Sequence, residues 1–355
     1  MTSFTLTPDY LPASPKNPRR WGIGLVGCGE IARLAHLPAY TRFGYRVESC
    51  FDIDASASLQ VGQEFDIPVA STLEALLDNE NVDIIDLPVP TRFRHTIIAQ
   101  ICAHPRKLKA ILSQKPFADS LESARSLVEM CEKAGIVLMI NQQARWAPGH
   151  RALKQAIERG DIGPLYSVLN IIRSWQDDPT SWFVKTPDFN ILDHGIHWID
   201  LLRFFTGRDP VRVFATTTMK AGQCAVSPMI YTINFEFAAT EHLMATLHFN
   251  NIIPAFPQTS RWEWLVDGEH GTAHLNDTLK LVLSQSRECQ VFEMEGQWFP
   301  DAFGGSMGEL MSALDQQREP QCSGRDNLKS LELALAAVKS ARTGQSVHVG
   351  EGFSL

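Results

Sequence analysis

Short apolar segments alternate with stretches of helical periodicity between residues 21 and 141. The apolar segments cover residues 22–26, 46–51, 83–87, 108–113 and 136–140. Segments that are apolar throughout are typical of parallel strands whose sheet is covered on both faces. Asp119-x-x-Glu122 resembles a helix capping box, and Gly135 is placed to end the helix that follows it. These residues are therefore predicted to form a doubly wound α/β domain.

The pattern changes after Asn141. A helix is expected over 148–159, followed by a strand over 165–172 and a helix over 190–207. Asn190 can cap this last helix, and Gly207 can end it in the left-handed conformation.

From residue 211 onward β-rich segments predominate, at 211–218, 229–237, 242–249, 262–266 and 279–283. Asp267-Gly268 and Glu295-Gly296 supply turn signals, and helices are expected near 308–317 and 327–341. Strands joined by short turns indicate an antiparallel sheet, so this part is predicted to be α+β. The expected division is an N-terminal arm over 1–20, a Rossmann domain over 21–141 and a second domain over 142–355.

Composition and charge exclude several classes of function. The chain has 355 residues and a formal net charge of −8, which argues against nucleic acid or an anionic membrane as partner. No apolar segment approaches the ~20 residues of a membrane span, and the first twenty residues lack the apolar core of a signal peptide. The seven scattered cysteines include no C-x-x-C pair, so we expect a cytoplasmic protein without a metal site.

The first apolar segment leads into a glycine pattern. Gly27-Cys28-Gly29-Glu30-Ile31-Ala32 fits the dinucleotide fingerprint G-x-G-x-x-A in its required place between a strand and a helix. The alternative is an ordinary tight turn. Asp52 ends the second apolar segment 25 residues after Gly27, where a carboxylate accepts ribose hydroxyls and repels a 2′-phosphate. NAD is therefore favoured over NADP, whereas Asp54 reads as a solvated turn residue.

Ser113-Gln114-Lys115-Pro116 ends the apolar segment over 108–113. Ligands of open α/β sheets bind beyond the carboxyl ends of the strands, so Lys115 is aimed at the expected site. Pro116 restricts Lys115 to an extended backbone and is a candidate cis proline. A surface lysine before a turn proline is the alternative.

The helix over 190–207 carries Asp193 and His197 four residues apart, on one face. Gly195 lies between them, where glycine costs ~1 kcal/mol relative to alanine, and this suggests that the helix makes room for a ligand. The alternative is a core histidine held by a carboxylate. His194 lies ~100° around the helix from Asp193 and is assigned to packing or to the pocket wall.

In this order and spacing, the fingerprint, Asp52, the Lys-Pro pair and the Asp193/His197 helix resemble the Gfo/Idh/MocA oxidoreductases. The resemblance extends over nearly the whole chain from Trp21. It includes Leu87-Pro88-Val89-Pro90 with His95, Asn141 to Trp146, and the closing residues 330–347. One departure is Gln114, because the family usually has Glu-Lys-Pro. Glutamine keeps a hydrogen-bonding carbonyl but removes a charge beside Lys115.

The resemblance implies an NAD-dependent oxidoreductase acting on a sugar, cyclitol or related polyol, with its antiparallel sheet forming a homodimer or homotetramer. It assigns catalysis to Lys115, Asp193 and His197. Its implied cofactor-binding residues are Gly27, Cys28, Gly29, Glu30, Ile31, Asp52, Leu87, Pro88, His95, Gln114 and Lys115. The expected substrate-binding residues are Lys115, Arg145, Trp175, Asp193, His194 and His197.

The residue types suit alcohol oxidation. An unperturbed histidine has a pKa of ~6.5, which makes His197 the natural general base, while Lys115 stabilises the developing oxyanion. Asp193 orients the substrate or tunes the histidine. Trp175 and Trp182 flank carboxylates in one loop. One interpretation is that these residues bind a polyhydroxylated ligand, and the alternative is that the tryptophans only anchor the loop. Trp262 and Trp264 share one strand face, which favours sheet packing or a subunit interface.

Two other functions stay open at this point. One is a glycosidase or oxidoreductase that holds NAD tightly and recycles it within each turnover. The other is a nucleotide-sensing regulator of the same fold, which would have no need of the catalytic residues.

Overall fold

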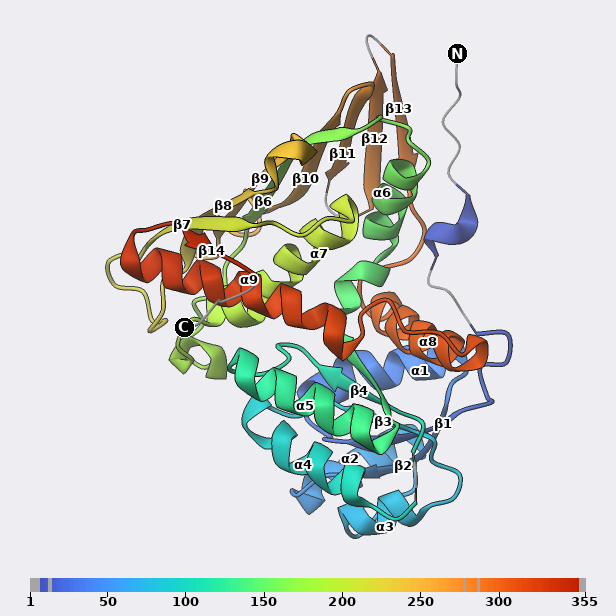
Figure 1. Ribbon diagram of the computed structural model, residues 1–355. Helices are drawn as coiled ribbons and strands as arrows, with labels where there is room; N and C mark the ends of the chain where they lie inside the picture. Colours follow the sequence, from blue (N-terminus) through green and yellow to red (C-terminus); the bar gives the residue numbers. More distant parts are fainter. Residues whose placement is uncertain (1–6, 12–14, 107, 277–278, 286–287, 351–355) are drawn as a thin grey trace. The chain divides into compact units, whose positions relative to one another are not determined.

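The computed structural model describes residues 7–11, 15–106, 108–276, 279–285 and 288–350 (Figure 1). Contacts divide the chain into two compact units. The parallel-sheet unit comprises residues 11–147 and 297–328, and the antiparallel-sheet unit comprises residues 1–10, 148–296 and 329–355. The expected boundary near 141 is close to the observed change at 147. Residues 297–328 differ from the expectation, because they return to the first unit rather than staying in the second.

Five parallel strands form the first unit's sheet, in the order β2-β1-β3-β4-β5. Their bounds are β1 Gly22–Val26, β2 Arg46–Phe51, β3 Ile84–Leu87, β4 Ala110–Gln114 and β5 Val137–Asn141. Every residue of β1, β3 and β4 is buried, as expected for a sheet covered on both faces. The prediction of a doubly wound α/β domain is confirmed.

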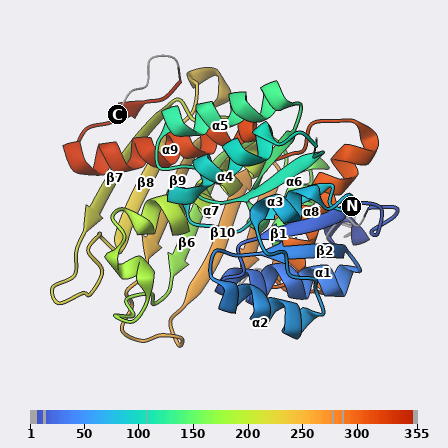
Figure 2. The same ribbon diagram turned by 90° about the horizontal axis from the view of Figure 1, so that it is seen from below.

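Helices cover this sheet. After β1 the chain forms a π-helical turn, Ala32–His36, that continues into α1, Leu37–Phe43. The others are α2 Ala55–Phe65, α3 Leu73–Asp78, α4 Thr91–Ala103, α5 Leu121–Ala134, the 3-10 turn Gln143–Trp146 and α8 Asp301–Gln316. Helices α4 and α5 lie side by side (Figures 1 and 2), and α8 packs on α1, which explains why its segment belongs to this unit.

The cap expected for α5 is displaced by one residue. Ser120, not Asp119, has the extended backbone of an N-cap, and its side chain accepts the Ser123 N–H at 3.1 Å. The predicted end is confirmed, because Gly135 adopts the left-handed conformation at φ 69°.

The second unit contains a nine-stranded sheet in the order β13-β12-β11-β10-β6-β9-β8-β7-β14. All neighbouring strands are antiparallel except β6 and β9. The bounds are β6 Leu165–Arg173, β7 Arg212–Thr218, β8 Ile230–Glu236, β9 Met244–Asn250, β10 Arg261–Gly268, β11 Gly271–Asn276, β12 Lys280–Gln285, β13 Glu288–Glu293 and β14 Val347–His348. The predicted α+β class is confirmed, although β11, β13 and β14 are additional to the expected strands.

Helices α6 (Pro148–Glu158) and α7 (Ile196–Thr206) pack on one face of this sheet, and α9 runs over Gly324–Thr343 (Figure 1). Trp264 packs against Trp198 and Phe205 of α7, and Trp262 packs against Trp198. Of the two functions weighed for this pair of β10 tryptophans, sheet packing is the correct one. Short helical turns cover Trp182–Lys185, Asn190–Gly195 and Ala239–Glu241.

Residues 7–10 are not an isolated arm. The 3-10 turn Pro8–Tyr10 contacts α6, where Arg151 donates to the Asp9 carbonyl at 2.9 Å. Tyr10 is buried, and its hydroxyl accepts the Glu295 N–H at 3.2 Å.

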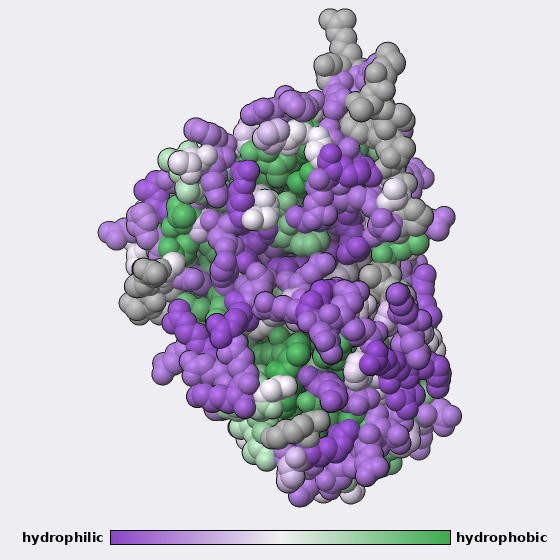
Figure 3. Space-filling view, turned by 45° about the vertical axis from the view of Figure 1, so that its right-hand side comes forward, coloured by the Kyte–Doolittle hydropathy of each residue, from purple (hydrophilic) through white to green (hydrophobic). Residues whose placement is uncertain are grey.

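Hydrophilic residues predominate on the face shown in Figure 3, and hydrophobic residues gather there in separate patches. Among the helices that the structure describes, none is both long and apolar enough to cross a membrane.

Candidate active site

The turn after β1 has the geometry that a dinucleotide phosphate requires. Gly27 has φ 108°, and a Cβ added to it would lie 2.8 Å from Val89 Cγ1, so only glycine fits. A Cβ on Gly29 would meet no atom within 4 Å, which leaves open space before the helix that begins at Glu30. Buried Ala32 lets that helix pack closely. Free N–H groups at this helix start suit a pyrophosphate.

The backbone N–H of Cys28, not its thiol, makes the contact with Asp52. A hydrogen bond with Cys50, and then burial, raises the pKa of the Cys28 thiol, so the thiol stays neutral. Its N–H donates to Asp52 Oδ2 at 2.7 Å. This bond ties the end of β2 to the fingerprint turn.

Asp52 and Asp54 have separate tasks. Asp52 is half-buried, and its Oδ1 accepts the Asp54 N–H at 2.9 Å. Asp54 caps α2, and hydrogen bonds from Ser56 lower the pKa of its carboxyl group. The carboxylate next to the fingerprint is therefore that of Asp52, whereas Asp54 stabilises the following helix.

Three loops of the first unit follow β1, β3 and β4, which are adjacent strands. Leu87 is buried at the end of β3, and Pro88 leads toward α4. His95 lies exposed on α4, with its Nε2 3.4 Å from Ser126 Oγ of α5. Gln114 ends β4 and precedes Lys115, so Lys115 and the fingerprint stand at the same edge of one sheet.

The backbone of Lys115 is held on both sides. Gln114 Oε1 accepts its N–H at 2.8 Å, and the guanidinium of Arg94 donates to its carbonyl at 3.3 Å. Arg94 also donates to the carbonyls of Pro116, Phe117 and Val89. The Lys115-Pro116 bond is cis, as the sequence suggested, and Lys115 itself is half-buried.

A buried polar network lies behind this loop. His36 Nδ1 is 2.7 Å from Asp86 Oδ2, which also accepts the Tyr40 hydroxyl at 2.7 Å. Burial, and then the negative charge of Asp86, raises the pKa of Tyr40, so Tyr40 remains a donor. Neither this network nor the role of Arg94 was predicted from the sequence. Asp86 offers a signal, since it is the one charged residue in the apolar strand Ile84–Leu87.

The helix that carries Asp193 begins differently from its prediction. Residues 190–195 form a π-helical turn, and the regular helix α7 follows. Asn190 does not cap it. The Asn190 side chain is buried and accepts a hydrogen bond from Asn251 Nδ2. The predicted end is correct, with Gly207 left-handed at φ 64°.

Gly195 makes room for protein rather than for a ligand. A Cβ there would lie 2.8 Å from the Asn190 carbonyl oxygen and 3.1 Å from a ring carbon of Phe249 on β9. The π-helical turn and the close approach of the sheet together require glycine, so the suggestion of space for a ligand at Gly195 is wrong.

His194 is anchored by amide side chains. Asn251 Nδ2 lies 3.1 Å from His194 Nδ1, and Ser174 Oγ donates to Asn251 Oδ1 at 2.7 Å. Since an amide nitrogen only donates, His194 accepts at Nδ1 and carries its proton at Nε2. His197 on α7 is buried at 8% exposure, and Asp193 in the π-helical turn before α7 is half-buried.

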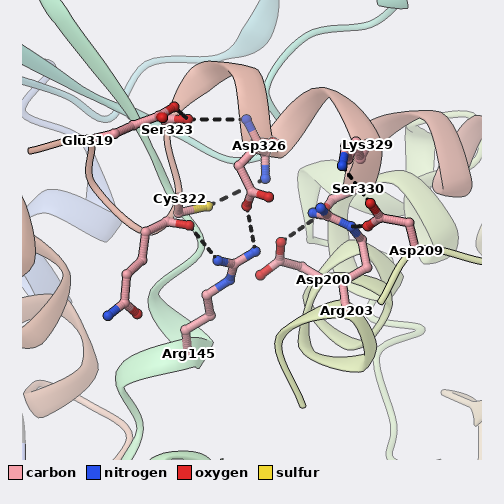
Figure 4. Close-up of polar contacts among 12 residues, drawn as sticks. Arg145, Asp200, Arg203, Asp209, Glu319, Cys322, Ser323, Asp326, Lys329 and Ser330 are labelled. Atoms are coloured by element: carbon pink, nitrogen blue, oxygen red, sulfur yellow. Dashed lines mark hydrogen bonds and ion pairs between the residues drawn. The ribbon is translucent and has the colours of Figure 1, made fainter. Parts of the chain in front are cut away.

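The far end of α7 is held by charged contacts. Arg203 donates to Asp209 and to Ser330 Oγ, and Ser330 donates to Asp200 at 2.7 Å (Figure 4). These contacts fasten α7, which carries His197, to the part of α9 in the same unit.

The remaining predicted residues belong to both units. In the first unit Arg145 donates to the Gln321 carbonyl at 2.8 Å and to Asp326 at 2.9 Å (Figure 4). In the second, Trp175 and Trp182 are 43% and 64% exposed. Their loop is anchored by Asp177, which accepts the backbone N–H groups of Cys224 and Ala225.

Two family models match the chain. Residues 21–142 match the oxidoreductase family with an NAD-binding Rossmann fold, and residues 150–274 match the GFO/IDH/MocA C-terminal domain. The chain belongs to the Gfo/Idh/MocA family.

Relatives within the Gfo/Idh/MocA family span the whole chain. D-apiose dehydrogenase of Paraburkholderia graminis is 28% identical over 98% of this chain and 94% of its own. Inositol 2-dehydrogenase of Rhizobium meliloti is 22% identical over 92% of this chain and 98% of its own. The structure of an Agrobacterium radiobacter oxidoreductase in complex with NAD+, L-tartaric acid and magnesium has a TM-score of 0.82 at 24% identity, over 92% and 98% of the two chains.

As a Gfo/Idh/MocA protein, the chain is an oxidoreductase with an NAD-binding domain. The geometry of the fingerprint fits that cofactor. There is open space at Gly29, a helix starts at the next residue, and the carboxylate of Asp52 lies beside the turn.

Replacing Arg94 by lysine is expected to disturb the Lys115 loop of this Gfo/Idh/MocA protein. A lysine keeps the charge but cannot serve four carbonyls at once, so we expect a loss of about 2 kcal/mol in unfolding free energy and about tenfold in kcat/KM. Urea unfolding and steady-state kinetics measure both. Arg92→Lys is the control, because Arg92 is exposed on the same helix. Equal behaviour of the two variants would contradict the role of Arg94.

Proposed function

We propose that the chain transfers hydride between NAD and a hydroxyl-bearing carbon of a sugar, cyclitol or related polyol. The observation that carries the proposal is the common edge of the parallel sheet, where the fingerprint follows β1 and Lys115 follows β4. A cofactor bound along this edge brings its reactive ring toward the lysine.

The proposed cofactor contacts follow from the loops of this edge. Backbone N–H groups of Gly29, Glu30 and Ile31 bind the pyrophosphate. Gly27 and Cys28 shape the turn through their hydrogen bonds to Phe51 and Asp52, and Asp52 accepts the adenosine ribose hydroxyls. Leu87, Pro88 and His95 line the path beyond β3, and Gln114 and Lys115 border the nicotinamide riboside. When bound, NAD supplies the acceptor for the hydride that leaves the substrate carbon.

The protein residues handle the proton and the developing charge. His197 accepts the hydroxyl proton as the C–H hydride leaves, so the alcohol carbon becomes a carbonyl carbon. The ammonium of Lys115 donates a hydrogen bond to the oxygen while it carries negative charge. Asp193 orients the substrate hydroxyl or the imidazole. In the reverse reaction His197 returns the proton.

The activities for which relatives are named suggest the substrate class. They include a D-apiose dehydrogenase, an inositol 2-dehydrogenase and the 1,5-anhydro-D-fructose reductase of Ensifer adhaerens, which is 27% identical over 94% of this chain. We propose that Arg145, Trp175 and His194 contribute to binding such a substrate.

A substrate panel tests the proposed function. Sugars, aldonates and inositols are incubated with NAD or NADP, and reduced nicotinamide is followed by its absorbance. Net NADH formation with at least one polyol is expected. Product formation without net NADH would indicate a retained, recycled cofactor instead. NAD binding without turnover across the panel would favour a nucleotide-sensing regulator.

Asp52 is expected to set the cofactor preference. Replacing Asp52 by serine removes the charge that repels a 2′-phosphate, a repulsion of about 1 kcal/mol at 4 Å in water, so the ratio of the Kd for NADPH to that for NADH should fall about fivefold. Fluorescence titration with NADH and NADPH measures both constants. Asp54→Asn is the matched control, since it removes a charge two residues away but keeps a helix cap. A wild-type preference for NADP would refute this role.

We propose that the open face of the nine-stranded sheet forms a homodimer or homotetramer. On the face opposite α6 and α7, one row crosses five strands by register: Val291, Val282, His274, Leu265 and Leu169. Four of the five are apolar and at least partly exposed, which favours burial against a second copy. Light scattering on the eluted protein measures the mass, and a monomer would refute the proposal.

A further inference from the structure

A chain of hydrogen bonds joins the buried core to Lys115. It runs from Asp86 on β3 through His36, at the end of the first π-helical turn, to Gln114 on β4, and ends at the Lys115 N–H. His36 Nε2 lies 3.1 Å from Gln114 Nε2. Asp86, His36 and Gln114 are each less than a tenth exposed. None of these three side chains takes part in the proposed proton transfer.

The backbone N–H of Lys115 determines which group donates and which accepts in every hydrogen bond of this series. The N–H of Lys115 can only donate, so Gln114 turns its Oε1 toward it and its amide nitrogen toward His36. An amide nitrogen also only donates, so His36 Nε2 must offer its lone pair. The imidazole proton is then on Nδ1, where it is donated to Asp86.

We infer that His36 is a positioning residue that acts as a neutral imidazole with its proton on Nδ1, and that it orients Gln114 and, through it, the backbone of Lys115. The inference rests on the proposed catalytic role of Lys115 for its functional meaning. Glutamine at position 114 matches a neutral His36, whereas glutamate would accept a hydrogen bond from a protonated Nε2.

The groups around His36 support this assignment. Asp86 faces it from β3, and Tyr40 lies on its own helix with its hydroxyl 3.4 Å from His36 Nδ1. Helix α8 contributes the uncharged ring of Phe303, whose centroid is 4.9 Å from that of His36. Asp86 and Tyr40 are the titratable groups in contact with His36 among the residues that the structure describes. Tyr40 stays neutral, so a single negative charge, that of Asp86, faces the imidazole.

Protonation of His36 would disrupt this series of hydrogen bonds. An Nε2–H would face the amide nitrogen of Gln114, which places two donors together. Rotation of the amide would relieve that clash but would turn its nitrogen toward the Lys115 N–H, again two donors. The loop that carries Lys115 is therefore coupled to the charge of a histidine in the core.

Nitrogen NMR of the imidazole rings tests the inference directly. In the full-length wild-type protein at pH 7, His36 should show one unprotonated nitrogen, Nε2, and a protonated Nδ1. In Gln114→Glu, the unprotonated signal should be lost, because the introduced carboxylate accepts from a protonated Nε2. His36→Gln assigns the resonance. His104, which contacts Asp78 and the Arg106 carbonyl elsewhere in the unit, should not move.

Two results of this experiment would overturn the inference. They are a wild-type His36 with its proton on Nε2, and an unprotonated Nε2 signal that persists in Gln114→Glu. Because the readout is the ring itself, the result does not depend on finding a substrate. A chain that fails every substrate panel could still confirm the orientation of His36.

Kinetics supply a second test once a substrate is known. His36→Gln keeps an oxygen where Nε2 stood, so it can still accept from Gln114, whereas His36→Phe cannot. Both variants lose the bond from the imidazole to Asp86, so that loss is common to them. We expect kcat of His36→Gln to stay within about threefold of wild type and kcat of His36→Phe to fall about tenfold further, the equivalent of one hydrogen bond. Equal kcat values would refute the positioning role.

Discussion

Substitution of Lys115 by alanine is expected to lower kcat/KM about 10²–10³-fold, which is the usual cost of removing one donor from a developing oxyanion. The ammonium is proposed to act on the substrate oxygen only while charge develops there, so kcat should fall more than KM rises. The chain fold should persist, because the hydrogen bonds of this loop come from the backbone of Lys115 and from its neighbours. Steady-state kinetics on the substrate found by the panel measures the loss.

Lys109 provides the matched control for this substitution. It is exposed and directly precedes β4, so Lys109→Ala removes the same charge and side chain at the other end of the same strand. Lys109→Ala should keep full activity and the wild-type thermal midpoint. Unchanged turnover in Lys115→Ala on a confirmed substrate would refute the mechanism. If Lys115→Ala loses activity as expected, Lys115→Arg shows whether any cation at this position is sufficient.

The parallel sheet could be predicted because its signal is local. Strands β1, β3 and β4 are buried on both faces and therefore apolar at almost every position. The cap of α5 shows the limit of this reasoning. Asp119 and Ser120 are both good capping residues, and only the backbone, extended at Ser120 with φ −148° and ψ 158°, decides between them.

Features that depend on distant partners could not be predicted. The π-helical turn over 190–195 keeps the apolar pattern of an ordinary helix, and the reason for Gly195 lies on β9, in the ring of Phe249. Helix α8 is buried over most of its length, and its contacts with α1 and with β4 and β5 assign it to the first unit. Local sequence does not state which core a helix covers.

The residues of the candidate site also divide into those that could be predicted from the sequence and those that could not. Lys115, Asp193 and His197 could be proposed from the sequence because a known family pattern carries them. Arg94 could not, because its acceptors are backbone carbonyls, which leave no mark in the sequence. Asp86 could have been found, since a carboxylate inside an apolar strand needs a buried partner. His36, four residues after the end of the fingerprint, is that partner.

Replacing His197 by glutamine is expected to lower kcat about 10²–10⁴-fold, the range typical of general acid–base catalysis. Glutamine can occupy the position of the ring but cannot take a proton from the substrate. In the wild type, oxidation should slow as the pH falls through the range in which histidine becomes protonated, because a protonated base cannot accept. In His197→Gln, the residual rate should lose this acid limb.

The substitution His194→Gln distinguishes the role of His194 from that of His197. His194 accepts from Asn251 at Nδ1, so glutamine disturbs its anchoring but not the proposed proton transfer, and a loss of less than about tenfold with an intact acid limb is expected. If His194→Gln removed the acid limb while His197→Gln kept it, the general base would be His194. Asn251→Asp would then be the decisive variant, because a carboxylate in place of the amide would hold a proton on His194 Nδ1 and free Nε2 to act as the base.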